Sequence, residues 1–208
     1  MSKAEKKPAR DFTYGEYCTW SDDARYELID GDVFDMTPGP GRLHQELLME
    51  LATLLHTFFK GKPCKVYVAP FDVRLPNRKE ADEEIKTVVQ PDILVVCDES
   101  KLDDKGCRGA PDLIVEILSP STSSKDRVRK LNLYEKHGVR EFWIVDPNGD
   151  VMRFNLGSDR RYGRPMTFDR SMSLTSEIFP GLSITLDDVF PKPPKPLKNV
   201  RHPSPTFS

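Results

Sequence analysis

Two acidic residues stand out because each lies in a segment that is otherwise apolar. Asp92 opens a run that continues to Cys97, and Glu116 lies inside the run Leu113–Leu118. An ionised carboxylate among isoleucine and valine side chains is unfavourable unless it is paired or binds a metal ion. One such residue is usually half of a buried ion pair. Two of them on neighbouring strands favour a shared divalent cation, because carboxylate oxygens are the ligands that Mg²⁺ prefers.

A simple hairpin would bring these two acids to one face of a sheet. We expect residues 98–112 to connect two antiparallel strands, with the turn centred near residue 105. That register sets Glu116 opposite Leu94. Because residues two apart on a strand point to the same side, Glu116 and Asp92 then share a face. Asp92 and Glu116 are therefore the candidate metal ligands.

A lysine on the following helix is the third candidate. We expect a helix over residues 125–137, with Val128, Leu131 and Tyr134 as its packing stripe and Lys130 at the flank of that stripe. An ammonium group beside a metal ion can orient an attacking water and stabilise negative charge on the transition state of phosphodiester hydrolysis. The alternative is that Lys130 is one of several surface lysines.

Two further residues have less distinctive surroundings. Glu27 lies in a predicted strand, on the opposite face from Tyr26 and Leu28, and an exposed strand acid is the ordinary interpretation. His44 lies in the first turn of a predicted helix, where it can simply cap or pack. Either residue can also be a neighbour of the site.

The elements that must position these residues follow from the apolar pattern and the turn residues. Asp30 and Gly31 predict a tight turn between two strands, and leucines at three- and four-residue steps predict a helix over residues 42–60. Further strands are predicted over 65–68, 71–75, 88–97, 111–118, 141–145 and 151–154. This order is typical of an α/β or α+β fold in which one layer of mixed β-sheet is flanked by helices.

Length and composition indicate one globular domain, which we expect over residues 13–190. Of the 208 residues 38% are hydrophobic and 31% are charged, which excludes collagen, coiled-coil and membrane classes. The longest apolar runs are far shorter than the roughly 20 residues of a membrane span. No apolar stretch follows the first lysines, so we expect no secretory signal and a cytoplasmic protein without membrane contact.

Charge is unevenly distributed along the chain. Residues 1–12 and 191–208 form basic tails, the second rich in proline and lysine. Residues 1–10 carry a net charge of +3 and residues 191–208 of +4, so residues 11–190 carry about −9 within a total of −2. An acidic body fits a site that concentrates carboxylates around a divalent cation better than a protein that reads DNA sequence. The tails can hold a nucleic-acid backbone or simply keep the acidic body in solution.

Four cysteines are scattered along the chain. Cys18, Cys64, Cys97 and Cys107 form no CxxC pair, which argues against a structural zinc site. Without an export signal we expect all four to be reduced thiols, with Cys97 an ordinary core residue.

The motifs together resemble the PD-(D/E)xK restriction-endonuclease-like superfamily. More closely, several segments are similar to the Uma family of predicted endonucleases and occur in that family's order: YELIDGDV, LHQEL, PFDVRL, VVQPDILVV, GAPDLIVEILSPST and KLNLYEKHGVREFWIVDP. They cover roughly residues 25–147. The pattern is far more specific than a lone Pro-Asp pair, of which Pro111-Asp112 is a second example that we interpret as structural.

The resemblance implies a restriction-endonuclease-like core. It implies Asp92 and Glu116 as ligands of Mg²⁺ or Mn²⁺, with Glu27 and His44 as site neighbours. The superfamily places its lysine two residues after the glutamate, where this chain has Leu118. The family takes its lysine from the following helix, which implies Lys130.

The leading hypothesis is therefore a Mg²⁺-dependent endonuclease that hydrolyses DNA, in a form that can be a homodimer. An alternative is an inactive nuclease-fold module that binds nucleic acid or a protein partner, which the acidic body and Leu118 favour. A carboxylate-pair hydrolase acting on another substrate class ranks last.

Overall fold

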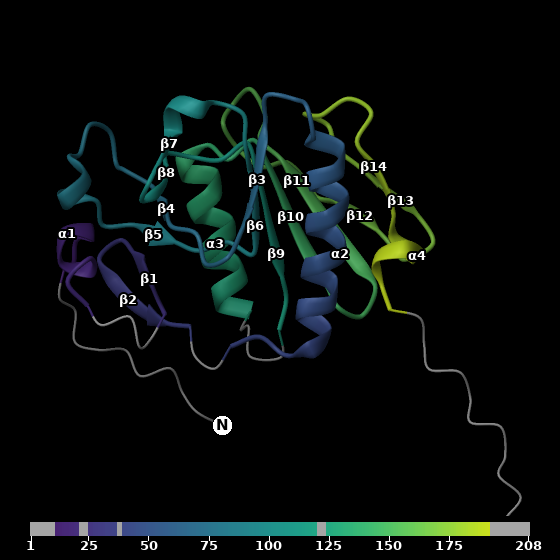
Figure 1. The fold of residues 1–208 in the computed structure, drawn as a ribbon, viewed down its shortest axis with the longest axis horizontal. Helices are drawn as coiled ribbons and strands as arrows, with labels where there is room; N and C mark the ends of the chain where they lie inside the picture. Colours follow the sequence, from purple (N-terminus) through teal and green to yellow (C-terminus); the bar gives the residue numbers. More distant parts are fainter. Residues whose placement is uncertain (1–10, 21–24, 37–38, 120–123, 192–208) are drawn as a thin grey trace, which may run out of the picture.

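The computed structural model describes residues 11–20, 25–36, 39–119 and 124–191 (Figure 1). In chain order the elements are α1 (Tyr14–Tyr17), β1 (Tyr26–Ile29), β2 (Asp32–Asp35), α2 (Arg42–Phe59), β3 (Lys65–Val68), β4 (Val73–Arg74), η1 (Asp82–Glu84), β5 (Val88–Val89), β6 (Ile93–Val96), η2 (Glu99–Lys101), β7 (Leu102–Asp103), β8 (Gly106–Arg108), β9 (Leu113–Ile117), α3 (Ser124–His137), β10 (Glu141–Asp146), β11 (Asp150–Asn155), β12 (Met166–Phe168), β13 (Ser173–Thr175), β14 (Ser183–Thr185) and α4 (Leu186–Val189).

The predicted mixed α/β architecture is confirmed, but the strands form more than one layer. The central sheet has the order β12-β11-β10-β9-β6-β3, and a second sheet has the order β2-β1-β5-β4-β8-β7. In the central sheet β9 and β10 run parallel, while the other neighbouring strands are antiparallel. Figure 1 shows α2 on one side of the central sheet and α3 on the other, with the second sheet beyond α3.

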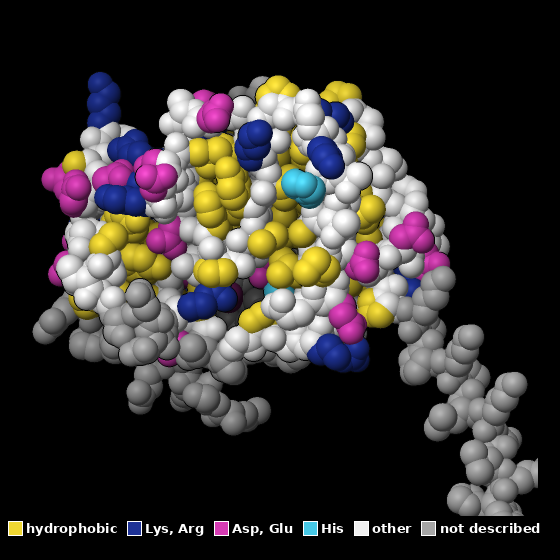
Figure 2. Space-filling model, in the orientation of Figure 1, with side chains coloured by type: hydrophobic (Ala, Val, Ile, Leu, Met, Phe, Trp, Pro, Cys, Tyr) yellow, Lys and Arg dark blue, Asp and Glu magenta, His cyan; other side chains and the backbone are white. Residues whose placement is uncertain are grey.

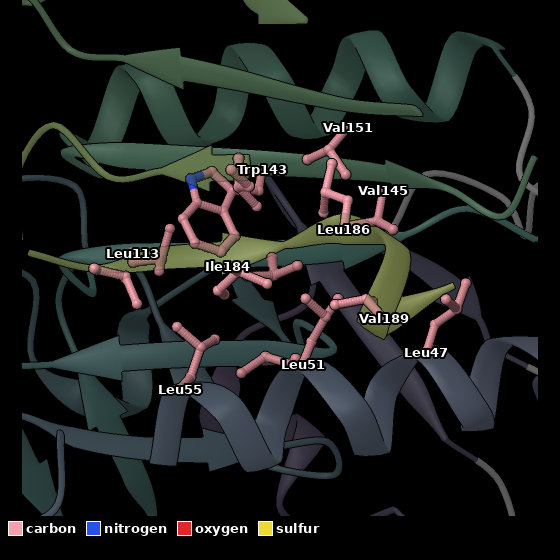
Figure 3. Close-up of a cluster of buried hydrophobic side chains, with 14 of the residues drawn as sticks. Leu47, Leu51, Leu55, Leu113, Trp143, Val145, Val151, Ile184, Leu186 and Val189 are labelled. Carbon is pink, nitrogen blue, oxygen red and sulfur yellow. The ribbon is translucent and has the colours of Figure 1, made fainter. Parts of the chain in front are cut away.

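One face of the central sheet packs against α2. Leu47, Leu51 and Leu55 recur every four residues, so they form one apolar stripe on this helix, and all three are fully buried. They pack with the odd-numbered residues of β6 and β9 and with the segment that includes β13, β14 and α4 (Figure 3). The predicted helix over 42–60 is thus confirmed as α2.

The other face of the central sheet packs against α3 and the second sheet. Its core contains the even-numbered residues of β6 and β9, such as Leu94 and Ile114. The buried residues of α3 are Lys130, Leu133 and Tyr134, whereas Val128 is 56% exposed. Tyr134 and Leu131 of the predicted stripe pack into this core, but Val128 does not, and the buried Lys130 is a charged residue that an apolar pattern cannot reveal.

The strand predicted over 88–97 is interrupted near its middle. Pro91 has no N–H for a sheet ladder, and the chain leaves the second sheet after β5 and enters the central sheet at β6. Asp92 lies in this break, immediately before β6.

The register of β6 against β9 differs by two residues from the predicted one. Ile93 pairs with Val115 and Leu94 with Ile114, so the register continued by one residue sets Asp92 opposite Glu116. The prediction was wrong because residues 98–112 do not form a simple turn: β7 and β8 lie in this connection and join the second sheet. A shift of two residues preserves strand parity; Glu116 meets α3, whereas the carboxylate of Asp92, in the break before β6, meets the start of α2.

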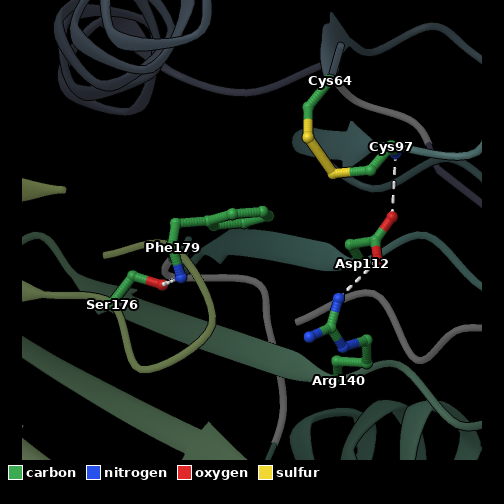
Figure 4. Close-up of a disulfide and its surroundings, with 6 residues drawn as sticks. All are labelled: Cys64, Cys97, Asp112, Arg140, Ser176 and Phe179. Carbon is green, nitrogen blue, oxygen red and sulfur yellow. Dashed lines mark hydrogen bonds and ion pairs between the residues drawn. A yellow bond between two sulfur atoms is a disulfide. The ribbon is translucent and has the colours of Figure 1, made fainter. Parts of the chain in front are cut away.

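Two of the four cysteines are oxidised, which corrects the expectation of reduced thiols. Cys64 and Cys97 form a disulfide (Figure 4), while Cys18 and Cys107 are free. Lys65 pairs with Val96 between β3 and β6, so Cys64 and Cys97 are the next opposed residues of an antiparallel pair. The spacing of the cysteines in the sequence carries no sign of this pairing.

The basic tails predicted over 1–12 and 191–208 lie almost wholly outside the described residues. In the part of the chain that the structure describes, no helix combines the length and the apolar character that crossing a membrane requires.

Candidate active site

Asp92 is held from two sides at the start of β6. Its Oδ2 accepts a hydrogen bond from the backbone N–H of Ile117, 2.7 Å away, and lies 3.1 Å from Nε2 of His44. His44 is in the first turn of α2 and is buried. The break before β6 and the start of α2 thus bring these two predicted site residues together.

The nearby acids change the pKa of His44. Burial opposes its charged form, but the hydrogen bond to Asp92 and the negative charges of Asp92 and Glu116 outweigh burial and raise the pKa of His44. Its Nδ1 is buried and has no hydrogen-bond partner among the described residues.

Glu116 meets two donors that lie one helical turn apart on α3. Its Oε1 accepts from Nζ of Lys130 at 2.9 Å and from the hydroxyl of Tyr134 at 2.6 Å. Burial raises the pKa of Glu116 to about 7; Lys130 opposes this rise, and the charges of Asp92 and Glu27 add to it.

Lys130 lies between two carboxylates. Its Nζ also donates to Oε1 of Glu27 at 3.1 Å, and its side chain is only 11% exposed. Burial disfavours the ammonium form, but Glu116 and Glu27 overcome this effect and raise the pKa of Lys130 well above its usual value. Lys130 is therefore a fixed positive charge at neutral pH, not one of the surface lysines of α3.

Glu27 is buried, which corrects the interpretation of an exposed strand acid. Its side chain is 5% exposed, and besides Lys130 its Oε1 accepts from the backbone N–H of Gln90 at 3.0 Å. β1 is covered on both faces, since Leu28 packs with Tyr14, Ile85 and Val88 while Glu27 turns toward α3. The second sheet that causes this burial is not visible in the local sequence.

Gln90 belongs to the same network. Its Oε1 accepts from Nε and Nη2 of Arg25, and its Nε2 donates to Oδ1 of Asp72 at 2.8 Å. These contacts fix the residue whose backbone N–H holds Glu27. The only sign of Gln90 in the sequence is that it directly precedes Pro91-Asp92.

The five candidate residues form two hydrogen-bonded groups, His44 with Asp92 and Lys130 with Glu27 and Glu116, and the negative charge of Asp92 acts on Glu116. Asp92, Glu116 and Glu27 each use one carboxylate oxygen for protein donors, and the other oxygen of each has no hydrogen-bond donor among the described residues. Three carboxylates face one ammonium and one imidazole. On the face shown in Figure 2, a hollow lies between the lower ends of α3 and α2, with magenta and cyan side chains at its floor.

The donor chemistry of this cluster fits a divalent cation that keeps part of its water shell. No group of three or more His, Cys, Asp and Glu side chains in the described ranges is arranged to hold a metal ion. Mg²⁺ does not require such a cage, because it is usually bound through one or two carboxylates together with waters and substrate phosphates. The remaining oxygens of Asp92 and Glu116 can supply those two carboxylates, and a cation would offset the excess negative charge.

Comparisons with known proteins relate this chain to a family and a solved structure that are both described as nucleases. A family model described as "Uma2: Putative restriction endonuclease" matches residues 14–187. The "Uncharacterized protein slr1290" of Synechocystis sp. is 29% identical over 132 residues, and the match covers 62% of this chain and 65% of that protein. A crystal structure of "a putative nuclease belonging to DUF820" from Anabaena variabilis superposes with a TM-score of 0.68 at 19% identity, over 86% of this chain and 97% of the other.

Proposed function

The chain belongs to the Uma2 family, and from this premise we propose that it is a divalent-cation-dependent endonuclease that hydrolyses DNA phosphodiester bonds. One observation carries the proposal: Nζ of Lys130 lies 2.9 Å from Glu116 and 3.1 Å from Glu27, and the negative charge of Asp92 acts on the same Glu116. Acids at this sheet can hold a metal ion, and the ammonium group can stabilise negative charge on a phosphate.

Asp92 and Glu116 would hold the cation, Mg²⁺ or Mn²⁺, through the oxygens that protein donors leave free. A bound cation supplies a nucleophilic water at neutral pH and neutralises charge on the phosphate. His44 and the backbone N–H of Ile117 orient Asp92, so its other oxygen stays available.

Lys130 acts in this proposal as a fixed charge rather than as a base. Because its pKa is raised, it retains its proton at neutral pH and stabilises negative charge that develops on the phosphate. Leu118 occupies the position at which the superfamily has its lysine. The side chain of Lys130 reaches Glu116 from α3 instead. This contact supports Lys130 as the replacement for the lysine that is missing at position 118.

DNA as the substrate and a homodimer as the active form are further parts of the proposal. Three carboxylates repel a phosphate group, so we expect binding of DNA at the site to require the cation. Two copies would present two sites to the two strands of a duplex.

The test compares the candidate metal ligands Asp92 and Glu116 with Asp112, an acid that also follows a proline. Asp92→Asn and Glu116→Gln are expected to reduce plasmid cleavage in Mg²⁺ or Mn²⁺ by more than the about 10- to 100-fold that outer-shell changes cause, because each removes a metal-ligand charge. Both are also expected to lose the heat of Mn²⁺ binding in calorimetry. The matched control is Asp112→Asn.

Asp112 is a suitable control because it also follows a proline and is buried, whereas Asp92 is partly exposed, and because it serves a structural contact. It accepts from the backbone N–H of Cys97 at 2.8 Å and pairs with Arg140 at 2.9 Å (Figure 4). Asp112→Asn is expected to keep cleavage and Mn²⁺ binding. Undiminished cleavage by Asp92→Asn and Glu116→Gln would reject the assignment.

Leu118 also favours the alternative of an inactive module that binds nucleic acid or a protein. This alternative predicts that the wild-type chain binds DNA without cleaving it in either metal. The same cleavage measurements therefore distinguish the two functions.

A further inference from the structure

Tyr134 contacts the site through an atom that the proposed chemistry does not otherwise use. Its hydroxyl donates to Oε1 of Glu116 at 2.6 Å, and its side chain is fully buried. Lys130 donates to the same oxygen at 2.9 Å. Two donors on one face of α3 therefore converge on one of the two oxygens of a single carboxylate.

The two donors are not equivalent. Lys130 is shared with Glu27, so its ammonium group is drawn toward both acids. The tyrosine hydroxyl has Glu116 as its hydrogen-bond partner among the described residues. A second donor from a rigid aromatic side chain restricts rotation of the carboxylate further than Lys130, which is shared with Glu27, does alone.

The ring of Tyr134 is held independently of its hydroxyl. It packs edge-to-face against Phe142 of β10, with ring centroids 5.0 Å apart, within the core between α3 and the central sheet. A ring fixed by the core places its hydroxyl at one position in the site. A phenylalanine at position 134 would keep the packing and remove only the donor.

We propose that Tyr134 is a positioning residue whose hydroxyl fixes Glu116, so that Oε2 of this carboxylate is presented to the divalent cation. The inference rests on the proposed function, because it concerns a ligand of the proposed metal site. It extends that function by assigning the orientation of the ligand to a neutral side chain that does not itself contact cation or substrate.

Tyr162 provides a matched control within the same aromatic cluster. Its ring also contacts Phe142, at 6.4 Å between centroids, and its hydroxyl donates to the backbone oxygen of Val139 at 2.9 Å. Tyr162→Phe removes one partly buried hydrogen bond without a change in the contacts of Glu116. Any general effect of losing a tyrosine hydroxyl near Phe142 therefore shows in this variant.

The experiment measures Mn²⁺ affinity by calorimetry and plasmid cleavage over a range of Mn²⁺ concentrations for the wild type and both variants. Tyr134→Phe is expected to weaken Mn²⁺ binding and lower kcat by about 10- to 100-fold, with KM for DNA unchanged. Raising the Mn²⁺ concentration is expected to restore part of the rate in Tyr134→Phe but none in Glu116→Gln. Tyr162→Phe is expected to match the wild type in both readouts.

Equal Mn²⁺ affinity and kcat in Tyr134→Phe and Tyr162→Phe, in a wild type that binds Mn²⁺ and cleaves, would overturn this inference and leave the proposed function intact. A loss in Tyr134→Phe that comes with a lower unfolding midpoint than that of Tyr162→Phe, and that excess Mn²⁺ does not reverse, would also overturn it. A wild type that neither binds Mn²⁺ nor cleaves overturns the proposed function, and the inference falls with it.

Discussion

Glu116 is the residue on which the charges of the site converge. Burial raises its pKa to about 7, against the effect of Lys130 and with the help of Asp92 and Glu27. Near neutral pH its carboxyl group is therefore partly protonated in the protein without metal. In the proposed site a divalent cation would bind the ionised carboxylate, so its binding would compete with a proton.

The affinity for Mn²⁺ is expected to rise as pH increases through about 7 and to level off above it. The sign follows from Glu116: below its pKa the carboxyl carries the proton that the cation must displace, and above its pKa that cost disappears. Calorimetry at several pH values, in two buffers of different ionisation enthalpy, measures both the affinity and the proton release.

His44 requires a control in this experiment. Its pKa is also raised, through Asp92, so loss of its proton changes the affinity in the same direction. In His44→Gln the rise near pH 7 is expected to remain, whereas in Glu116→Gln it is expected to vanish together with most of the affinity. A pH-independent affinity in the wild type would contradict the role given to Glu116.

At the scale of the elements, the sequence predicts what local patterns determine. The leucine period of α2 and the Asp30-Gly31 turn, with φ values of +49° and +82°, were confirmed because neighbouring residues alone determine them. Asp92 and Glu116 could be identified as candidate site residues because a single carboxylate in an apolar run is unusual in any fold. Their position opposite each other follows from the pairing of β6 with β9, and the two-residue error in the predicted register did not change their strand parity.

The features that the sequence analysis did not predict depend on residues that are distant in sequence. The burial of Glu27 comes from a second sheet whose strands are drawn from residues 26 to 108. The true stripe of α3 contains Lys130, which becomes favourable to bury only because Glu116 and Glu27 meet it there. No periodicity of apolar residues can reveal such a stripe, and the Cys64–Cys97 pairing required the register of β3 against β6.

The disulfide is expected to stabilise the attachment of the edge strand β3 to β6. It joins residues 33 apart in the sequence, so it restricts the unfolded chain, and its reduction is expected to lower the free energy of unfolding by about 2–4 kcal/mol. Urea unfolding with and without a reductant measures the difference. In the double variant Cys64→Ser, Cys97→Ser the reductant is expected to have no effect, and an unchanged wild type would show that the pair does not form.

At the scale of the whole molecule, the proposed site lies in the acidic part of the chain, whereas the excess positive charge lies in its two ends. Residues 11–190 carry a net charge of about −9, which includes the three carboxylates of the proposed site. The basic residues of the chain's ends lie outside this acidic body in the sequence. A negative body repels a polyanion over distances of about a Debye length, roughly 8 Å at physiological salt. We therefore expect the ends to supply much of the sequence-independent attraction to DNA.

This expectation is testable in the full chain through the salt dependence of binding. Lys192, Lys195, Lys198 and Arg201 are replaced together by glutamine, and binding to a labelled duplex is followed by fluorescence anisotropy without divalent cation, so that cleavage is prevented. Each released counterion contributes about 0.9 to the slope of log K against log salt, so the slope is expected to fall by about 3 to 4. A variant in which Pro193, Pro194 and Pro196 are replaced by alanine keeps the charges and is expected to keep the slope. An unchanged slope in the glutamine variant would assign these residues to keeping the acidic body in solution rather than to binding DNA.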